Sequence, residues 1–289
     1  MKKLYLLIFL VLFVISASLA TFKQDFSQVE IRTEKVAGNV YLLRSNVAGN
    51  IGLSVGEDGV LMVDDQFAPL SDKIRAAIKK LGGDSPRYIL NTHHHRDHTG
   101  GNPKFSAEST IIAHTNVRKR LASEPKEAWP VITFDESLSV HMNGEEIKAV
   151  HFPPGHTDGD AVIYFTGSNV VHMGDDFFAG RFPFVDLDGG GSVEGLIQNV
   201  KKILDDLPPG VKIIPGHGPV SGRKELQAYY DMLVGTSEVV KKQMVAGKTL
   251  DEIKKQGLPS RWDAWSWRFV SAERWIETIY KSAQNSKKM

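Results

Sequence analysis

Short apolar runs separated by turn residues dominate the first part of the chain. Residues 39–45, 50–65 and 87–92 are such runs, rich in Val, Ile and Leu, and each predicts β-strand. Glutamate, aspartate and glycine at 57–59 interrupt the second run, which predicts a β-hairpin there.

The segment between these strands has a different period. Residues 70–83 (LSDKIRAAIKKLGG) place apolar side chains three and four positions apart, which predicts an amphipathic helix. Ser71 fits the position of an N-cap and Gly82 that of a helix stop.

The second part of the chain repeats this order. Further strands are predicted over 145–153, 160–167, 169–175 and 211–218, and helices over 192–207 and 222–247. Two sheets with helices on their outer faces account for the order, as an α/β fold. Residues 21–289 are expected to form one domain with a helical C-terminal extension from about 222.

The C-terminal tail carries an apolar stripe. Trp262, Trp265, Phe269 and Ile276 recur at helical spacing, which predicts a helix packed on the domain. An aromatic wall over a functional site and a contact between subunits are the alternatives.

The first twenty residues have the layout of a secretory signal. Two lysines precede an apolar run from Leu4 to Ile15, and small residues follow up to Ala20. We expect cleavage after Ala20 and a periplasmic or secreted protein; an uncleaved anchor is the alternative. The chain has no cysteine, so disulfides and a lipid-modified cysteine are excluded.

Composition and charge restrict the classes of binding partner that we expect. The chain of 289 residues is 42% hydrophobic and 24% charged, which is typical of a globular protein. Its formal net charge is +1 and no long run of like charge occurs, so neither nucleic acid nor a membrane surface is expected as a partner. A small-molecule substrate is expected instead, and the oligomeric state cannot be read from the sequence.

The strongest chemical signal is the segment NTHHHRDHTGG at 91–101. Side chains alternate along a strand, so His93 and His95 point the same way from its end. The glycines that follow allow a turn that directs Asp97 and His98 toward a neighbouring point. Imidazole and carboxylate are ligands of Zn²⁺ and similar cations, so this turn can serve two adjacent metal ions.

Other metal-ligating side chains follow strands elsewhere in the chain. FPPGHTDGD presents His156, VVHMGDDFF presents Asp175 and Asp176, and IIPGHGP presents His217. Each lies in a glycine-bearing loop after a predicted strand, where residues from separate strands can converge on one edge of a sheet.

From about residue 39 to 218 the chain resembles the metallo-β-lactamase superfamily. The resemblance rests on four motifs in this order: THHHRDHTGG, PGHT, GDD and PGHG. The resemblance implies a four-layer αββα sandwich. It implies His93, His95 and His156 as ligands of a first metal and Asp97, His98 and His217 as ligands of a second. Asp175 would bridge both metals, and Asp64 would orient a ligand histidine; a strand-terminal turn residue is the alternative for Asp64.

Two cations, most simply zinc, with iron or manganese as alternatives, would lower the pKa of a bridging water from ~15.7 to roughly 7. The resulting hydroxide would attack the carbonyl of a small ester, thioester, lactone or lactam. Asp97 would act as a ligand and as the orienter or proton carrier of the attacking water. The expected function is therefore an exported dinuclear metallo-hydrolase.

Departures from the zinc β-lactamases bear on the substrate. Those enzymes usually have cysteine where this chain has Asp175 and lysine where it has Phe178. Arg181 is a candidate to replace the charge of that lysine, and an ordinary surface arginine is the alternative. A bridging aspartate resembles the glyoxalase II-like thioesterases and lactonases instead. A β-lactamase and a non-catalytic periplasmic metal-binding protein are the alternatives. Phe67, Phe177, Phe178 and Phe182 are expected near the site mouth or in the core.

Overall fold

The computed structural model describes residues 25–285, and the predicted export signal at 1–20 lies outside them. The first sheet has seven strands in the order β1 (Arg32–Ala37), β2 (Val40–Arg44), β3 (Ile51–Gly56), β4 (Gly59–Val63), β5 (Tyr88–Asn91), β6 (Thr110–His114) and β7 (Ile132–Phe134). The second has five, in the order β12 (Lys212–Ile214), β11 (Val170–His172), β10 (Ala161–Phe165), β9 (Glu145–His151) and β8 (Ser137–Met142). The α/β fold class is confirmed.

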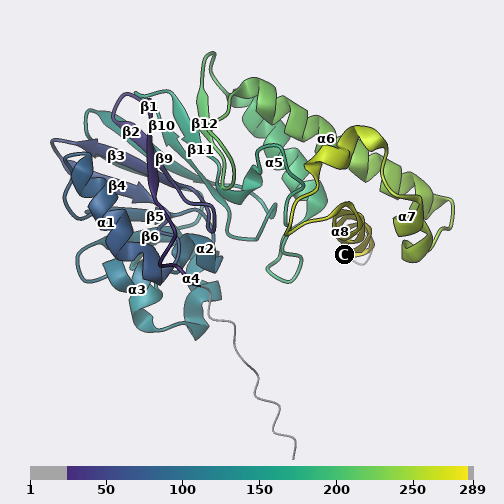
Figure 1. Cartoon of the computed structure of the whole chain (residues 1–289), viewed down its shortest axis with the longest axis horizontal. Helices are drawn as coiled ribbons and strands as arrows, with labels where there is room; N and C mark the ends of the chain where they lie inside the picture. The colour runs from purple at the N-terminus through teal and green to yellow at the C-terminus, as the bar shows by residue number, and fades with distance from the viewer. Residues whose placement is uncertain (1–24, 286–289) are drawn as a thin grey trace, which may run out of the picture.

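Helices lie on the outer sides of the two sheets and beyond their edges (Figure 1). Those of the first half are α1 (Ser71–Lys80), α2 (Arg96–Thr99), α3 (Asn102–Phe105) and α4 (Thr115–Arg120). Those of the second half are α5 (Val193–Asp206), α6 (Arg223–Val245), α7 (Leu250–Gln256) and α8 (Ala272–Asn285). Short 3-10 turns occur at Ala68–Leu70, Leu121–Ser123, Lys126–Ala128, Gly174–Asp176 and Ser260–Trp265. Within the described residues, no helix is both long and apolar enough to cross a membrane.

Strands buried on both faces hold the layers together. On β2, Leu42 faces the core between the two sheets, whereas Leu43 faces the core under α1. On β10, Ile163 faces the core between the sheets and Val162 faces the core formed with α5, α6 and α8. This alternation explains why these strands appear in the sequence as nearly continuous apolar runs.

The hairpin expected at 50–65 is present as β3 and β4, with Gly56 paired to Gly59. The helix expected at 70–83 is α1, and Gly82 lies beyond its end with φ +84°. The expected N-cap was wrong: Leu70 occupies that position, and the Ser71 hydroxyl donates to the Ala68 carbonyl in the preceding 3-10 turn, at 2.8 Å.

The single helix expected for the tail was also wrong. Trp262 lies in a 3-10 turn, residues 266–271 form an irregular segment in which the Trp267 amide donates to the Val270 carbonyl, and only then does α8 begin. This irregular segment is held in place because the Trp267 indole N–H donates to the Phe182 carbonyl at 2.9 Å. Of the predicted stripe, Ile276 is buried on α8, but Phe269 is 50% exposed.

A stacked pair of histidines joins the ends of the two sheets. The rings of His114, at the end of β6, and His151, at the end of β9, lie 3.6 Å apart and nearly parallel. Burial lowers the pKa of His114 to about 4, with the charge of His151 acting in the same direction. Burial also lowers the pKa of His151, and the carboxylates of Asp135 and Asp158 only partly oppose these shifts.

We therefore expect the pair to make folding acid-sensitive. Both rings are neutral in the folded state but take up protons in the unfolded state below its pKa of about 6.5, so stability falls as the pH drops from about 6.5 to 4. His114→Asn, which keeps an acceptor at the N-cap of α4, should reduce this pH-dependent loss by roughly 1–3 kcal/mol. The measurement is urea unfolding of wild type and variant between pH 7 and 4.5.

His141 is exposed, so His141→Asn is the control. It should leave the dependence on pH unchanged. If the free energy of unfolding differed between wild type and His114→Asn by the same amount at every pH, the stacked pair would not take up protons on unfolding.

Candidate metal centre

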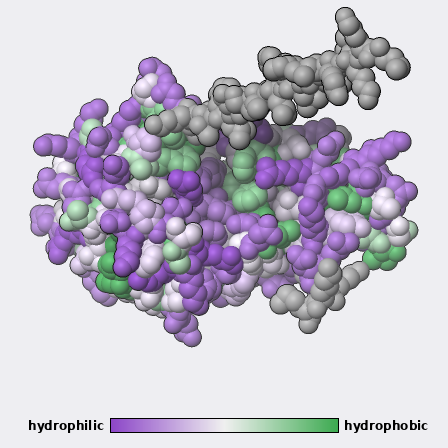
Figure 2. Space-filling view, turned by 90° about the horizontal axis from the view of Figure 1, so that it is seen from below, coloured by the Kyte–Doolittle hydropathy of each residue, from purple (hydrophilic) through white to green (hydrophobic). Residues whose placement is uncertain are grey.

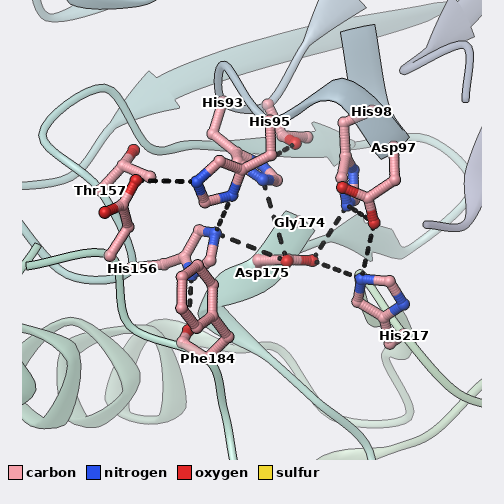
Figure 3. A network of polar contacts seen from close by, with 12 residues as sticks. His93, His95, Asp97, His98, His156, Thr157, Gly174, Asp175, Phe184 and His217 are labelled. Carbon is pink, nitrogen blue, oxygen red and sulfur yellow. Dashed lines mark hydrogen bonds and ion pairs between the residues drawn. The ribbon is translucent and has the colours of Figure 1, made fainter. Parts of the chain in front are cut away.

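Four loops bring seven metal-ligating side chains to one edge of the sandwich (Figure 3). All of these loops follow the ends of strands: β5 precedes the histidine-rich turn, β9 precedes the loop of His156, β11 precedes Asp175, and β12 precedes His217. The convergence expected from the sequence is therefore present.

Three histidines face one oxygen of Asp175. Its Oδ2 lies 3.8 Å from His93 Nε2 and 3.5 Å from His156 Nε2. His95 joins them through Nδ1, which lies 2.9 Å from His156 Nε2. The ligand atoms of these four residues lie within 4.8 Å of one another, so one cation can contact all of them.

The other oxygen of Asp175 faces a second set. Its Oδ1 lies 3.2 Å from His98 Nε2 and 3.5 Å from His217 Nε2. Asp97 completes the set, with Oδ2 at 3.3 Å from His217 Nε2 and 3.6 Å from His98 Nε2. Asp175 thus lies between the two groups of imidazoles, one oxygen toward each.

The outward nitrogens of the imidazoles are held by the protein. His98 Nδ1 lies 2.7 Å from Asp64 Oδ2, as expected for an orienting carboxylate, and His156 Nδ1–H donates to the Phe184 carbonyl at 2.7 Å. Such contacts fix which ring nitrogen turns to the centre. Asp64 also accepts from the Thr92 amide at 2.8 Å, and its backbone has a left-handed φ of +62°.

Sequence reasoning missed one residue of this kind. Asp186 Oδ2 lies 2.9 Å from His95 Nε2 and 3.7 Å from His94 Nε2. The hydrogen bond from His95 lowers the pKa of Asp186. Its loop, VDLDGGG, has no motif that relates it to a histidine 91 positions earlier, so only the folded structure reveals the contact.

Buried polar contacts position the loop of His217 against the first sheet. The Asn50 side chain donates to the carbonyls of Pro215 at 2.8 Å and Gly218 at 2.9 Å. Gly216 is required here because a Cβ at this position would collide with the Asp175 carboxylate.

The electrostatics divide the histidines into two groups. Burial lowers the pKa of His93 and lowers that of His156 to about 3. Burial acts the same way on His217, but the carboxylates of Asp175 and Asp97 outweigh it and raise its pKa to about 9. Burial would raise the pKa of Asp175, yet the surrounding imidazoles, first among them His217, hold it well below its usual range.

Three ligand-type atoms at the centre are buried without a hydrogen-bond partner among the described residues: His93 Nε2, His98 Nε2 and Asp175 Oδ1. A buried polar atom left unpaired costs about 1–3 kcal/mol, so native proteins rarely retain a cluster of them. Divalent cations would satisfy all three, because imidazole nitrogen and carboxylate oxygen are their ligands. The residues therefore fit a pair of divalent cations.

The other side chains that the sequence placed near the site differ in how deeply they are buried. Asp176 belongs to neither ligand set; burial and the neighbouring Asp160 raise its pKa well above the usual range. Phe177 and Phe182 are fully buried in the core under α5 and α6. Phe67 and Phe178 line the cavity that opens on the site.

Comparison with known proteins gives relatives of several activities. The 2,4-dinitroanisole O-demethylase subunit alpha of Nocardioides sp. is 26% identical over 77% of this chain and 69% of that protein. The metallo-beta-lactamase type 2 of Elizabethkingia meningoseptica is 24% identical over 74% and 88%. The hydroxyacylglutathione hydrolase of Rhodospirillum rubrum is 33% identical over 54% and 52%, so the match spans about half of that enzyme.

Solved structures agree on the fold. A metallo-beta-lactamase from Pontibacter korlensis superposes with a TM-score of 0.62 at 15% identity, over 71% of this chain and 99% of that one. A variant of the sec-alkyl sulfatase PisA1 superposes with a TM-score of 0.72 at 14% identity, over 88% of this chain and 50% of that one.

The family model that describes the metallo-beta-lactamase superfamily matches residues 38–217, which is more than half of the chain. That range spans the strands and loops that carry all seven converging side chains. The chain therefore belongs to the metallo-β-lactamase superfamily of metal-dependent hydrolases.

Proposed function

We propose that this protein is an exported hydrolase that binds two divalent cations, in the first instance zinc, and cleaves a small ester, thioester, lactone or lactam. The observation that carries the proposal is the position of Asp175, whose two oxygens face two separate sets of imidazoles. Export rests on the pattern of residues 1–20.

Divalent cations bound at this centre would make hydroxide available at neutral pH and polarise a carbonyl group, which is the chemistry that such hydrolysis requires. His93, His95 and His156 would hold one cation, Asp97, His98 and His217 the other, and Asp175 both. Asp97 has a further task, because its side chain is 26% exposed and lines the cavity. In this proposal Asp97 orients the attacking water and accepts its proton.

A β-lactamase is the second candidate, supported by the relative from Elizabethkingia meningoseptica and by the presence of Arg181 in the lining of the cavity. Nitrocefin and a carbapenem distinguish it from the leading proposal. A kcat/KM above roughly 10⁴ M⁻¹s⁻¹ on either would make β-lactams the substrate, and much slower turnover would mark the activity as incidental.

The chain lacking residues 1–20 should bind close to two zinc ions. His156→Ala should remove the first ion and His217→Ala the second, because each change deletes one imidazole from one set. Each variant should also lose at least about 100-fold in ester, thioester or lactone hydrolysis, since even partners behind the ligands are worth 10–100-fold. Elemental analysis and steady-state kinetics measure both effects.

His141→Ala, an exposed histidine on β8, is the control and should retain both metals and full activity. Two bound ions with no turnover of any ester, thioester, lactone or lactam would favour the non-catalytic metal-binding alternative. Zinc binding that persists in both ligand variants would reject the assigned centre.

Asp64→Asn tests the orienting role of that carboxylate. The amide keeps the size of the side chain but removes the charge that holds His98 Nδ1–H, so the second zinc ion should bind 10–100-fold more weakly while the first is retained. Competition with a chromogenic chelator gives both affinities, and Asp72→Asn on the exposed start of α1 is the control. Equal weakening of both ions would contradict the specific contact with His98.

A further inference from the structure

A cavity of about 1270 Å³ opens on the metal centre, with Asp97, Asp175 and His217 in its lining. The face seen in Figure 2 is largely hydrophilic, with separate apolar patches near its middle and toward both ends. With a volume of about 1270 Å³, the cavity can hold a substrate that extends well beyond the reacting carbonyl.

Aromatic rings line the cavity from the metal centre outward. The Phe178 ring stacks on His217 with centroids 5.1 Å apart, and Trp267 lies 6.2 Å from each of these two rings. Phe269 follows, 5.6 Å from both Trp267 and Phe184, and half of it is exposed. A partly exposed row of rings of this kind offers a flat apolar surface to a planar ligand.

The outer part of this row comes from the C-terminal segment, beyond the residues that match the family model. Trp267 is held by its indole hydrogen bond to the Phe182 carbonyl. Arg274 fixes Phe269 by donating to its carbonyl at 2.8 Å and by placing its guanidinium 4.6 Å from the ring centroid. The aromatic row is thus built into the fold rather than left as a free tail.

Arginines flank the same row. Arg181 lies with its guanidinium 5.1 Å from the Trp267 ring centroid, and Arg268 is the next residue along the chain; both line the cavity. Within residues 25–285 neither guanidinium has a carboxylate within ion-pair distance, whereas Arg32 at the rim pairs with Glu30 at 3.8 Å. A guanidinium that faces a cavity and has no carboxylate partner is suited to bind a planar anion, and that of Arg181 also lies beside the aromatic wall.

Resting on the proposed hydrolase function, we propose that the C-terminal segment makes the enzyme selective for anionic aromatic substrates. Trp267 and Phe269 stack on the apolar body of the substrate, and Arg181 and Arg268 pair with a carboxylate that it carries away from the scissile carbonyl. The subsite lies beside His217, so a bound substrate of this class presents its carbonyl to the metal centre.

Two esters that differ only in charge test this selectivity: phenyl 4-carboxybenzoate and phenyl 4-carbamoylbenzoate. The zinc-loaded protein should hydrolyse the carboxylate with at least about tenfold higher kcat/KM, equivalent to ~1.4 kcal/mol, and the ratio should fall with added salt. In the double variant Arg181→Gln, Arg268→Gln the ratio should approach one. Arg261→Gln is the matched control, because Arg261 is exposed in the same region, lies over Trp262 and does not line the cavity.

Trp267→Leu tests the aromatic half of the proposal. It should lower kcat/KM for phenyl 4-carboxybenzoate several-fold more than for monophenyl succinate, which has the same phenoxy leaving group and a carboxylate but an aliphatic acyl chain in place of the benzoyl ring. Equal wild-type rates on the charged and neutral esters, or a charge preference that survives in the double arginine variant, would overturn the proposal even if the protein is an active hydrolase.

Binding measured by calorimetry tests the subsite even if the protein does not hydrolyse these esters. If no ester is turned over, 4-carbamoylbenzoate should still bind the zinc-loaded wild type more tightly than terephthalamide does, and the double arginine variant should lose that difference. Persistence of the difference in the variant would mean that the carboxylate binds at the metals alone, which would reject the arginine subsite.

Discussion

The opposition of buried imidazoles and the Asp175 carboxylate is the constraint on which the rest of the molecule depends. His98 and His156 are fully buried beside it, and within the described residues His93 Nε2, His98 Nε2 and Asp175 Oδ1 have no hydrogen-bond partner. Such an arrangement is costly by itself and becomes favourable with cations between the ligands. The surrounding contacts, such as those of Asn50 and Asp64, make sense as supports that hold the loops in this otherwise unfavourable geometry.

Many of the strands and the loops that carry the ligands could be predicted from the sequence, because they depend on local sequence patterns. The apolar runs located the buried strands, and the histidines lie in the loops directly after them. Strand ends that share a sheet edge bring His156 and His217 to the turn of His93 without any long-range information beyond the fold class. The division of ligands between two metals came from the family resemblance, and metal binding itself remains a prediction.

The rest depended on contacts that leave no periodic trace. The single helix predicted for the tail was wrong because the helical spacing of Trp262 and Phe269 was accidental. The Trp267 indole donates to a carbonyl in a loop 85 residues earlier in the chain, and the backbone around it is irregular. Asp186 escaped notice for the same reason. The edge strand β8 was missed, although Leu138, Val140 and Met142 alternate with polar residues and could have revealed it. Likewise, the T-x-x-E capping box of α7 was readable.

The superfamily fold and the proposed substrate subsite come from different parts of the chain. The part that matches the superfamily model supplies the converging ligands, and the segment after residue 217 supplies Trp267 and Phe269 at the side of the cavity. This division explains how a widespread metal centre can serve different substrates: loops and extensions around the site change while the ligand geometry is kept.

Anomalous diffraction at the zinc absorption edge, from crystals of the zinc-loaded protein, tests the central claim most directly. The account predicts two peaks, one among His93, His95 and His156 and one among Asp97, His98 and His217, with the Asp175 carboxylate between them. A single peak outside these two sets, or no peak at all, would contradict it.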